Sequence, residues 1–174
     1  LTVFAFSSEN WNRPEDEVNG LMGLMASALA KEVVSLKANG VRLRCVGNRR
    51  QLSEKVRAGL AEAEAQTLGN DRLILNVCFN YGGRWDIAQA AEQLRQQQQP
   101  ITEEALAGAL SLSHVGDPDL LIRTGGEMRI SNFLLWQAAY SELYFSPVLW
   151  PDFDAKELDA AIADYQQRQR RFGK

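Results

Sequence analysis

Apolar positions along the chain alternate between short continuous runs and a helical spacing of three and four. Residues 1–6 form a run of β-branched, aromatic and aliphatic side chains, and residues 41–47 carry apolar side chains with arginines at 42 and 44, so each predicts a strand. Residues 14–39 carry apolar side chains at steps of three and four, which predicts an amphipathic helix. A proline and three acidic residues open this helix, and Asn39-Gly40 is typical of a helix end.

The same alternation continues through the rest of the chain. Further strands are predicted at 73–79, 119–122 and 143–145, and further helices at 51–67, after a turn at 80–83, after Thr102, from Ser131 through Ala138, and at 153–171. Strands that alternate with helices over short links are joined by right-handed crossovers and pair in parallel. The predicted fold is therefore α/β, with an open, mostly parallel sheet flanked by helices on both faces in a single domain.

Composition excludes several classes of protein. The 174 residues are 45% apolar, enough for one well-filled core. A formal net charge of −3 argues against a general nucleic-acid binder, and no apolar run approaches the ~18–20 residues of a transmembrane helix. Cys45 and Cys78 each lie inside an apolar run and are expected to be reduced core thiols rather than a disulfide or metal site. With one histidine, His114, a zinc site or a Ser-His-Asp triad is a poor interpretation.

Two polar segments follow predicted strands, where parallel α/β sheets bind their ligands. Residues 7–13 offer hydroxyls, an amide, an indole and a guanidinium directly before a predicted helix N-terminus. An ordinary capped loop with a packed tryptophan explains this segment equally well.

The second segment, residues 123–131, combines groups that bind an oxyanion. Its two glycines allow backbone N–H groups to approach a ligand, and Arg123 and Arg129 can each hold phosphate oxygens in bidentate fashion. Ser131 is expected at the N-terminus of the next helix, where the dipole favours an anion. A turn with surface arginines is the alternative. The glycine spacing matches neither the phosphate loop of nucleotide hydrolases nor the dinucleotide fingerprint, so a nucleotide is not implied.

Three long motifs resemble the signature blocks of the cis-prenyltransferases, and of their bacterial members most closely. They lie at residues 6–14, 80–86 and 123–137, and residues 150–153 and 170–173 fit as well. The family opens with an additional strand and an Asp-Gly-Asn-Gly-Arg-Trp loop, whose aspartate holds Mg²⁺. This sequence contains neither, so we expect residues 1–174 to be a single catalytic domain that lacks its N-terminal segment. Met128 stands where relatives can carry a histidine near the metal, and a thioether is a poor ligand for Mg²⁺.

The resemblance implies an Mg²⁺-dependent transferase. Such enzymes condense an allylic diphosphate, usually farnesyl diphosphate, with successive isopentenyl diphosphates into a long cis-polyprenyl diphosphate such as undecaprenyl diphosphate, a lipid carrier for cell-wall polysaccharides. The resemblance also implies a cytoplasmic homodimer without a nucleic-acid partner, associated transiently with the inner face of the plasma membrane. A non-catalytic accessory subunit of the same fold is the alternative. Such subunits are expected to lose the motif at 123–127, which is intact here.

Individual roles follow from the same resemblance. Asn10 matches the position assigned to proton removal, but an amide is a very weak base, so a relay through hydrogen bonds is the better interpretation. Glu142 matches a second Mg²⁺ carboxylate, although the residue alone suggests only a solvated surface side chain. The substrate-binding positions are Phe6, Ser7, Ser8, Glu9, Trp11, Arg13, Arg123, Arg129, Ile130, Ser131, Arg171 and Gly173.

A hydrophobic tunnel for the growing product is also expected. The helix at 14–39 carries a row of small side chains, which either close helix packing or a groove for a prenyl chain explains. Leu21 and Leu24 on this helix are candidates for the lining, and by resemblance Ala5 and Leu73 on strands face the tunnel.

Overall fold

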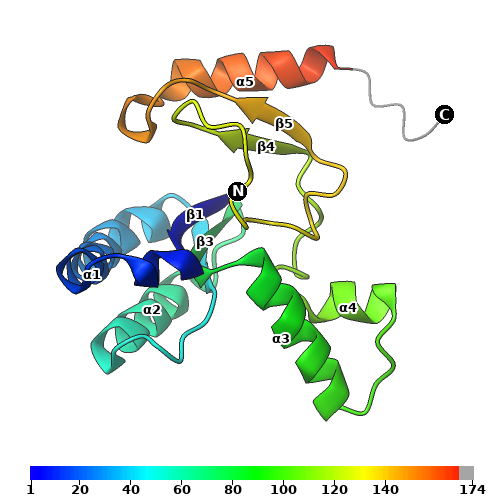
Figure 1. The fold of residues 1–174 in the computed structure, drawn as a ribbon. Helices are drawn as coiled ribbons and strands as arrows, with labels where there is room; N and C mark the ends of the chain where they lie inside the picture. The colour runs from blue at the N-terminus through cyan, green and yellow to red at the C-terminus, as the bar shows by residue number, and fades with distance from the viewer. Residues whose placement is uncertain (169–174) are drawn as a thin grey trace. The chain divides into compact units, whose positions relative to one another are not determined.

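The computed structural model describes residues 1–168, except for the side chains of residues 26 and 29. The chain divides into two compact units, Leu1–His114 and Val115–Lys174, and each is described by itself (Figure 1). The first contains β1 (Thr2–Ser7), the 3₁₀ helix η1 (Ser8–Asn12), α1 (Glu15–Ala38), β2 (Val41–Val46), α2 (Glu54–Thr67), β3 (Leu73–Tyr81), α3 (Gly83–Gln96) and α4 (Glu103–Ala109). The second contains β4 (Leu120–Arg123), β5 (Glu142–Phe145), the 3₁₀ helix η2 (Trp150–Asp152) and α5 (Ala155–Gln167).

All strand pairs in the described chain are parallel, as predicted. In the first unit the strand order is β1-β3-β2, and β2 pairs with β3 from Val41↔Leu73 to Val46↔Cys78. In the second unit β4 pairs with β5. Within each unit the backbone pairing is complete in itself, with a three-stranded sheet in the first and a two-stranded sheet in the second.

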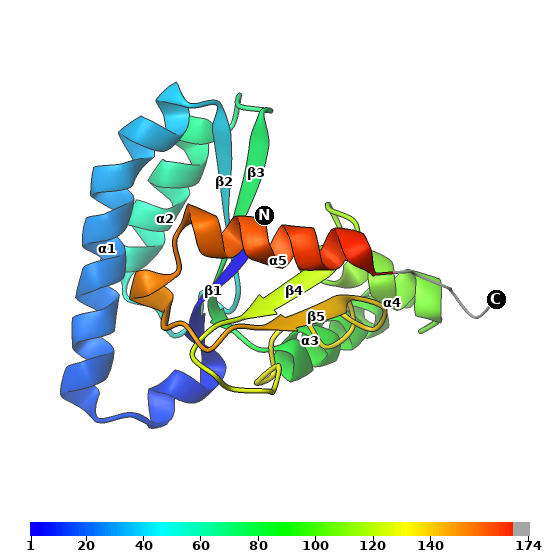
Figure 2. The same cartoon turned by 90° about the horizontal axis from the view of Figure 1, so that it is seen from above.

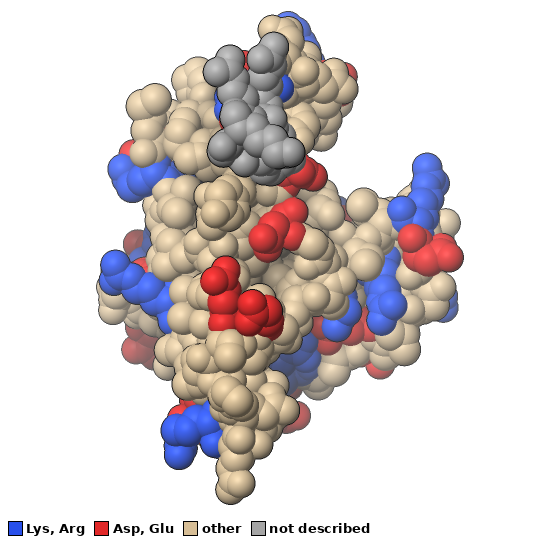
Figure 3. All heavy atoms as spheres, turned by 90° about the vertical axis from the view of Figure 1, so that its right-hand side faces the viewer, with Lys and Arg blue, Asp and Glu red and all other residues tan. Residues whose placement is uncertain are grey.

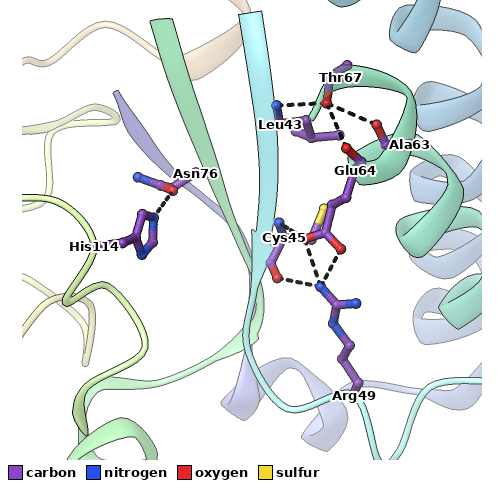
Figure 4. A network of polar contacts seen from close by, with 8 residues as sticks. All are labelled: Leu43, Cys45, Arg49, Ala63, Glu64, Thr67, Asn76 and His114. Carbon is purple, nitrogen blue, oxygen red and sulfur yellow. Dashed lines mark hydrogen bonds and ion pairs between the residues drawn. The ribbon is translucent and has the colours of Figure 1, made fainter. Parts of the chain in front are cut away.

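The core of the first unit lies between its sheet and helices α1 and α2, which run side by side next to β2 and β3 (Figure 2). Its buried side chains come from every one of these elements: Phe6, Val18, Val33, Leu43, Cys45, Leu52, Val56, Leu60, Ala63 and Phe79. On the opposite face of the sheet, His114 from the segment after α4 hydrogen-bonds to Asn76 of β3 (Figure 4).

Strand β1 has an irregular register at Ala5. Phe4 lies opposite Cys78 and Phe6 opposite Phe79, so the two phenylalanines pair with consecutive residues of β3 and point to opposite faces. The Phe4 ring contacts the ring of Tyr81, whereas Phe6 packs in the core. This irregularity leaves the Ala5 side chain exposed.

Side chains cap the outer edge of β2, which would otherwise present unpaired backbone groups for another strand. Two backbone N–H groups donate to side chains of α2, and two backbone carbonyls accept from side chains outside α2; Figure 4 shows the bonds at Leu43 and Cys45. The four bonds are Leu43 N to Thr67 Oγ1 (3.0 Å), Cys45 N to Glu64 Oε1 (2.7 Å), Asn70 Nδ2 to Val41 O (2.8 Å) and Arg49 to Cys45 O (2.8 Å). These four backbone groups of the edge are therefore satisfied within the first unit.

Most predicted elements are confirmed to within a few residues, and three local predictions were wrong. Residues 8–12, expected within a polar loop, form a 3₁₀ helix. The predicted turn at 80–83 is shorter, because β3 continues to Tyr81 and α3 begins at Gly83. No helix begins at Ser131: Ser131 and Asn132 both have a left-handed backbone (φ 47° and 57°), which a right-handed helix cannot contain. The predicted end of the last helix, beyond residue 168, lies outside the described residues.

The structure also bears on the cysteines, the membrane-spanning segments and the surface charge that the sequence analysis considered. Cys45 and Cys78 are buried free thiols, as predicted, and burial raises the pKa of each to about 12, so both remain protonated. Within residues 1–168, no helix is both long and apolar enough to cross a bilayer. On the face drawn in Figure 3, Lys and Arg side chains lie in separate groups, with Asp and Glu between them.

Candidate active site

The first polar segment is ordered by hydrogen bonds to its own backbone. The Ser7 Oγ accepts from the backbone N–H of Glu9 (3.1 Å), and the Asn10 Oδ1 accepts from the backbone N–H of Ser7 (2.8 Å). This reciprocal pair is a capping box, which stabilises the start of η1. The hydroxyls of Ser7 and Ser8 donate to the Glu9 carboxylate. The interpretation as a capped segment with a packed tryptophan is thus confirmed for the local structure.

The capping box fixes the orientation of the Asn10 amide. A backbone N–H donor requires an acceptor, so the atom that faces Ser7 is the amide oxygen and not the nitrogen. Asn10 Nδ2 has no hydrogen-bond partner among the described residues. Asn10 therefore presents N–H donors, and its oxygen, the one atom that could accept a proton, is already engaged.

Trp11 and Phe6 anchor the segment to the sheet. The Trp11 indole Nε1–H donates to the Oδ1 of Asn80 (2.8 Å), and its ring meets the Phe6 ring edge-on at 5.6 Å. Phe6 is buried in the core and Asn80 is buried at the end of β3, where its Nδ2 donates to the carbonyl of Asn48 (2.6 Å). Contacts of these two aromatic side chains therefore attach η1 to the sheet. Arg13 is exposed and lies 3.4 Å from the Glu17 carboxylate, a weak surface pair.

In the second segment, the glycine N–H groups are not free for a ligand. Gly125 and Gly126 have the left-handed φ values that glycine tolerates (84° and 74°). Their N–H groups donate to the carbonyls of Val148 (2.8 Å) and Ser146 (2.9 Å). The expectation that these amides approach an anion was wrong in this structure, because they attach the loop to the chain after β5.

The two arginines of this segment differ in what they contact. Arg123 ends β4, its side chain is half-buried, and its guanidinium has no ion pair among residues 1–168. Arg129 is exposed and forms an ion pair with Glu127. Half-buried Ile130 and exposed Ser131 belong to a turn closed by the Phe133 N–H and the Ile130 carbonyl (3.0 Å). Ser131 is therefore placed by a left-handed turn and not by a helix dipole.

Glu142 is the first residue of β5 and is held by an arginine. Arg168 donates to Glu142 Oε2 (2.9 Å) and pairs with Asp164, and these two carboxylates raise the pKa of Arg168. The interpretation of Glu142 as a freely solvated side chain was wrong, because it is half-buried in this cluster. The described residues contain no group of three or more His, Cys, Asp or Glu side chains that could hold a metal ion.

The four tunnel candidates lie in different surroundings within the first unit. Leu21 packs against the core, whereas Leu24 is 68% exposed on the outer side of α1. Leu73 opens β3 and is 41% exposed, and Ala5 is exposed at the irregular point of β1. The tunnel itself remains a prediction. Arg171 and Gly173 lie outside the described residues.

Sequence reasoning missed two buried polar side chains that organise the first unit. Asn80 holds Trp11 and has a left-handed backbone (φ 52°). Asp86, at the start of α3, accepts hydrogen bonds from the Tyr81 hydroxyl (2.8 Å) and from both the backbone N–H and the hydroxyl of Ser111 (2.9 and 2.6 Å). Both belong to the motif at 80–86, so these positions were identified from the sequence but no role was assigned to either residue.

Parallel strands, a capped polar segment after β1 in the first unit and a half-buried arginine at the end of β4 in the second define a protein of the α/β class. The family model described as "Putative undecaprenyl diphosphate synthase" matches residues 1–173. The chain belongs to this family of cis-prenyltransferases.

Individual relatives agree with this assignment. The chain is 56% identical to an isoprenyl transferase of Neisseria meningitidis, over 100% of this chain and 71% of the relative. It is 54% identical to the ditrans,polycis-undecaprenyl-diphosphate synthase ((2E,6E)-farnesyl-diphosphate specific) of Pseudomonas aeruginosa, over 100% of this chain and 72% of that protein. Among solved structures, a probable undecaprenyl diphosphate synthase from Campylobacter jejuni superposes with a TM-score of 0.94 at 38% identity, covering 100% of this chain and 83% of that one.

Proposed function

We propose that this chain is the catalytic region of an enzyme that extends farnesyl diphosphate with successive isopentenyl diphosphates to undecaprenyl diphosphate. The observation that carries the proposal is the 54% identity, along the whole chain, to the Pseudomonas aeruginosa enzyme of that activity. The unpaired, half-buried guanidinium of Arg123 at the carboxyl end of a parallel strand supports it.

Each condensation breaks the allylic C–O bond, forms one C–C bond to the isopentenyl double bond, and releases one pyrophosphate and one proton. Arg123 and Arg129 bind the isopentenyl diphosphate, and Ser131 adds a hydroxyl donor. Arg129 must exchange its Glu127 partner for the substrate, whereas Arg123 needs no such exchange. Ser7, Ser8, Glu9 and Trp11 line the substrate pocket beside Phe6, and Arg13 contributes charge.

Asn10 acts as a hydrogen-bond donor in this scheme. Because its amide oxygen accepts the Ser7 N–H, its Nδ2 group can orient a diphosphate oxygen that accepts the departing proton. The proton then leaves on the substrate's own phosphate, which is a much stronger base than an amide. This supports the relay interpretation over direct proton removal by Asn10.

Mg²⁺ is the implied cofactor, and Glu142 is the described residue proposed to hold it. Mg²⁺ takes oxygen ligands and commonly binds one or two carboxylates together with substrate phosphates and water, so the donor at Glu142 fits. The bound ion would neutralise charge on the departing diphosphate. Arg168, which now holds Glu142, would have to release it.

Changing Glu142 to glutamine should lower activity and raise the Mg²⁺ concentration needed for half-maximal rate, because the amide keeps the shape but loses the negative charge. The matched control is Asp164→Asn, which removes the other carboxylate that pairs with Arg168. The control should leave the Mg²⁺ requirement unchanged. A wild-type Mg²⁺ titration of the Glu142→Gln enzyme would show that Glu142 only holds Arg168.

The activity itself is tested by incubating the full-length protein with farnesyl diphosphate, radiolabelled isopentenyl diphosphate and Mg²⁺, and separating the products by reversed-phase chromatography. Labelled undecaprenyl diphosphate is the expected product. A folded protein that yields no extended product would instead be the non-catalytic accessory subunit. We further propose a cytoplasmic homodimer that meets the membrane when product leaves; light scattering and vesicle sedimentation test these two properties.

Product length is proposed to be set by the side chains that line the tunnel. Ala5→Leu adds volume beside the growing chain and should shorten the products, whereas Leu73→Ala should lengthen them, because tightly packed interiors make single side chains count. Since Leu73 is 41% exposed, its truncation should cost less than the ~2–5 kcal/mol typical of a core leucine. Leu68→Ala, at a 60% exposed leucine, is the matched control. An unshifted chain-length profile in both variants would contradict the tunnel.

A further inference from the structure

A small polar cavity lies in the first unit, at the carboxyl end of β2, and its lining includes no residue of either polar segment described above. Its volume is about 260 Å³, and its lining includes Arg44, Arg49, Glu64, Ser111 and His114. This is below the ~300–1,000 Å³ of sites for larger organic ligands, but is several times the ~30 Å³ share of one water molecule. The size suits a small ion of a few heavy atoms.

The charges around this cavity do not balance. Arg49 and Glu64 neutralise each other, with the arginine nitrogen 2.8 Å from the Glu64 carboxylate. Arg44 has no hydrogen bond or ion pair among residues 1–168 and is only half-exposed. Arg42 precedes it by two residues, on the same face of β2, and is equally unpaired in the described chain. The cavity is thus left with an excess of positive charge.

The His114 imidazole lines the same cavity. Asn76 donates from its Nδ2 to Thr2 Oγ1 (3.2 Å), so its Oδ1 faces His114 Nε2 (2.9 Å), which must be the protonated nitrogen (Figure 4). Burial, Arg44 and Arg42 lower the pKa of His114, against the Ser111 backbone, which favours the charged form. An anion in the cavity would reverse the effect of the arginines.

We propose that this cavity binds a small phosphate-type anion, held by the Arg44 guanidinium next to the His114 imidazole. Arg44 can hold two oxygens in a bidentate fork, while the Arg49–Glu64 pair closes one side without a net charge. No residue assigned to substrate or metal lines the cavity. The site does not depend on the proposed function.

The single histidine makes this site directly measurable. In the full-length protein, the His114 imidazole C–H resonances are followed by NMR during titration with inorganic pyrophosphate, inorganic phosphate and glycerol 3-phosphate. We expect a saturable shift, together with a rise of about one unit in the measured pKa of His114, as a nearby opposite charge produces. Response to the inorganic anions alone assigns a free anion, and an equal response to glycerol 3-phosphate assigns a terminal phosphate group.

Variants separate this cavity from other anion sites. Arg44→Gln should weaken the His114 response about tenfold or more, and Arg44→Lys less, because a point charge replaces the fork. Arg57→Gln, at an exposed arginine of α2, and Arg123→Gln, in the proposed substrate site, should both leave it intact. Circular dichroism confirms that each variant is folded. Unmoved His114 resonances in the wild type, or a full response in folded Arg44→Gln, would overturn the proposal.

Discussion

Replacing Arg123 with alanine is expected to lower kcat/KM for isopentenyl diphosphate about 10- to 150-fold. A hydrogen bond to a charged group contributes about 1.5–3 kcal/mol, and each ~1.4 kcal/mol is a factor of ten. Arg123 is the arginine of its segment without an ion pair in the described chain, so its whole contribution is available to the substrate. Arg129→Ala should cost less, since binding there must first displace Glu127.

Two further variants identify the source of this loss. Arg123→Lys should recover part of the activity, because an ammonium supplies charge but not the bidentate fork. Arg57→Ala removes an arginine that pairs only within α2 and should leave steady-state kinetics unchanged. If Arg123→Ala keeps wild-type KM and kcat, the diphosphate is bound elsewhere.

Replacing Gly47 with alanine is expected to cost about 3–5 kcal/mol of folding free energy. Gly47 follows β2 with φ 143°, and an added Cβ would lie 2.0 Å from the Phe79 carbonyl oxygen and 2.9 Å from that of Asn80. Backbone strain and overpacking each cost about 1–3 kcal/mol, and neither oxygen belongs to a side chain that could rotate away. Urea unfolding followed by circular dichroism measures the loss.

The matched control is Gly59→Ala in the middle of α2, where nothing lies within 4 Å of the added Cβ. This change should stabilise the protein by about 0.5–1 kcal/mol, because alanine suits a helix interior better than glycine. Equal unfolding midpoints for the two variants would contradict the steric argument. Because Asn80 holds Trp11, Gly47→Ala should also change the tryptophan fluorescence of the folded protein.

The strands and long helices were predictable because their apolar spacing is set by the core they bury. Residues 131–138 show the limit of that reasoning: the spacing of apolar side chains resembles a helix, yet Ser131 and Asn132 adopt left-handed backbones. Asparagine tolerates the left-handed region and serine adopts it at some cost, but neither residue type is enough to predict a left-handed backbone from the sequence. A helical spacing of apolar residues identifies the side chains that could be buried, but it does not show whether the backbone forms a helix or a turn.

The candidate residues were predictable from motifs, but their orientations were not. The glycines at 125 and 126 suggested N–H groups aimed at a ligand, and only the structure assigns those donors to Ser146 and Val148. Similarly, the motif assigned Asn10 to the active site, but it did not reveal that the Asn10 Oδ1 accepts a hydrogen bond from the Ser7 N–H. Both outcomes depend on which donors and acceptors the folded chain pairs with one another, and the residue types alone do not determine this pairing.

The capped edge of β2 has a consequence for what happens when the protein is heated. Two of its four caps, Glu64 and Thr67, come from α2, so detachment of that one helix would uncover two backbone N–H groups of the edge strand at once. A strand so exposed can recruit another chain. We therefore expect the detachment of α2 to set the temperature at which the protein begins to aggregate, even where the rest of the core is intact.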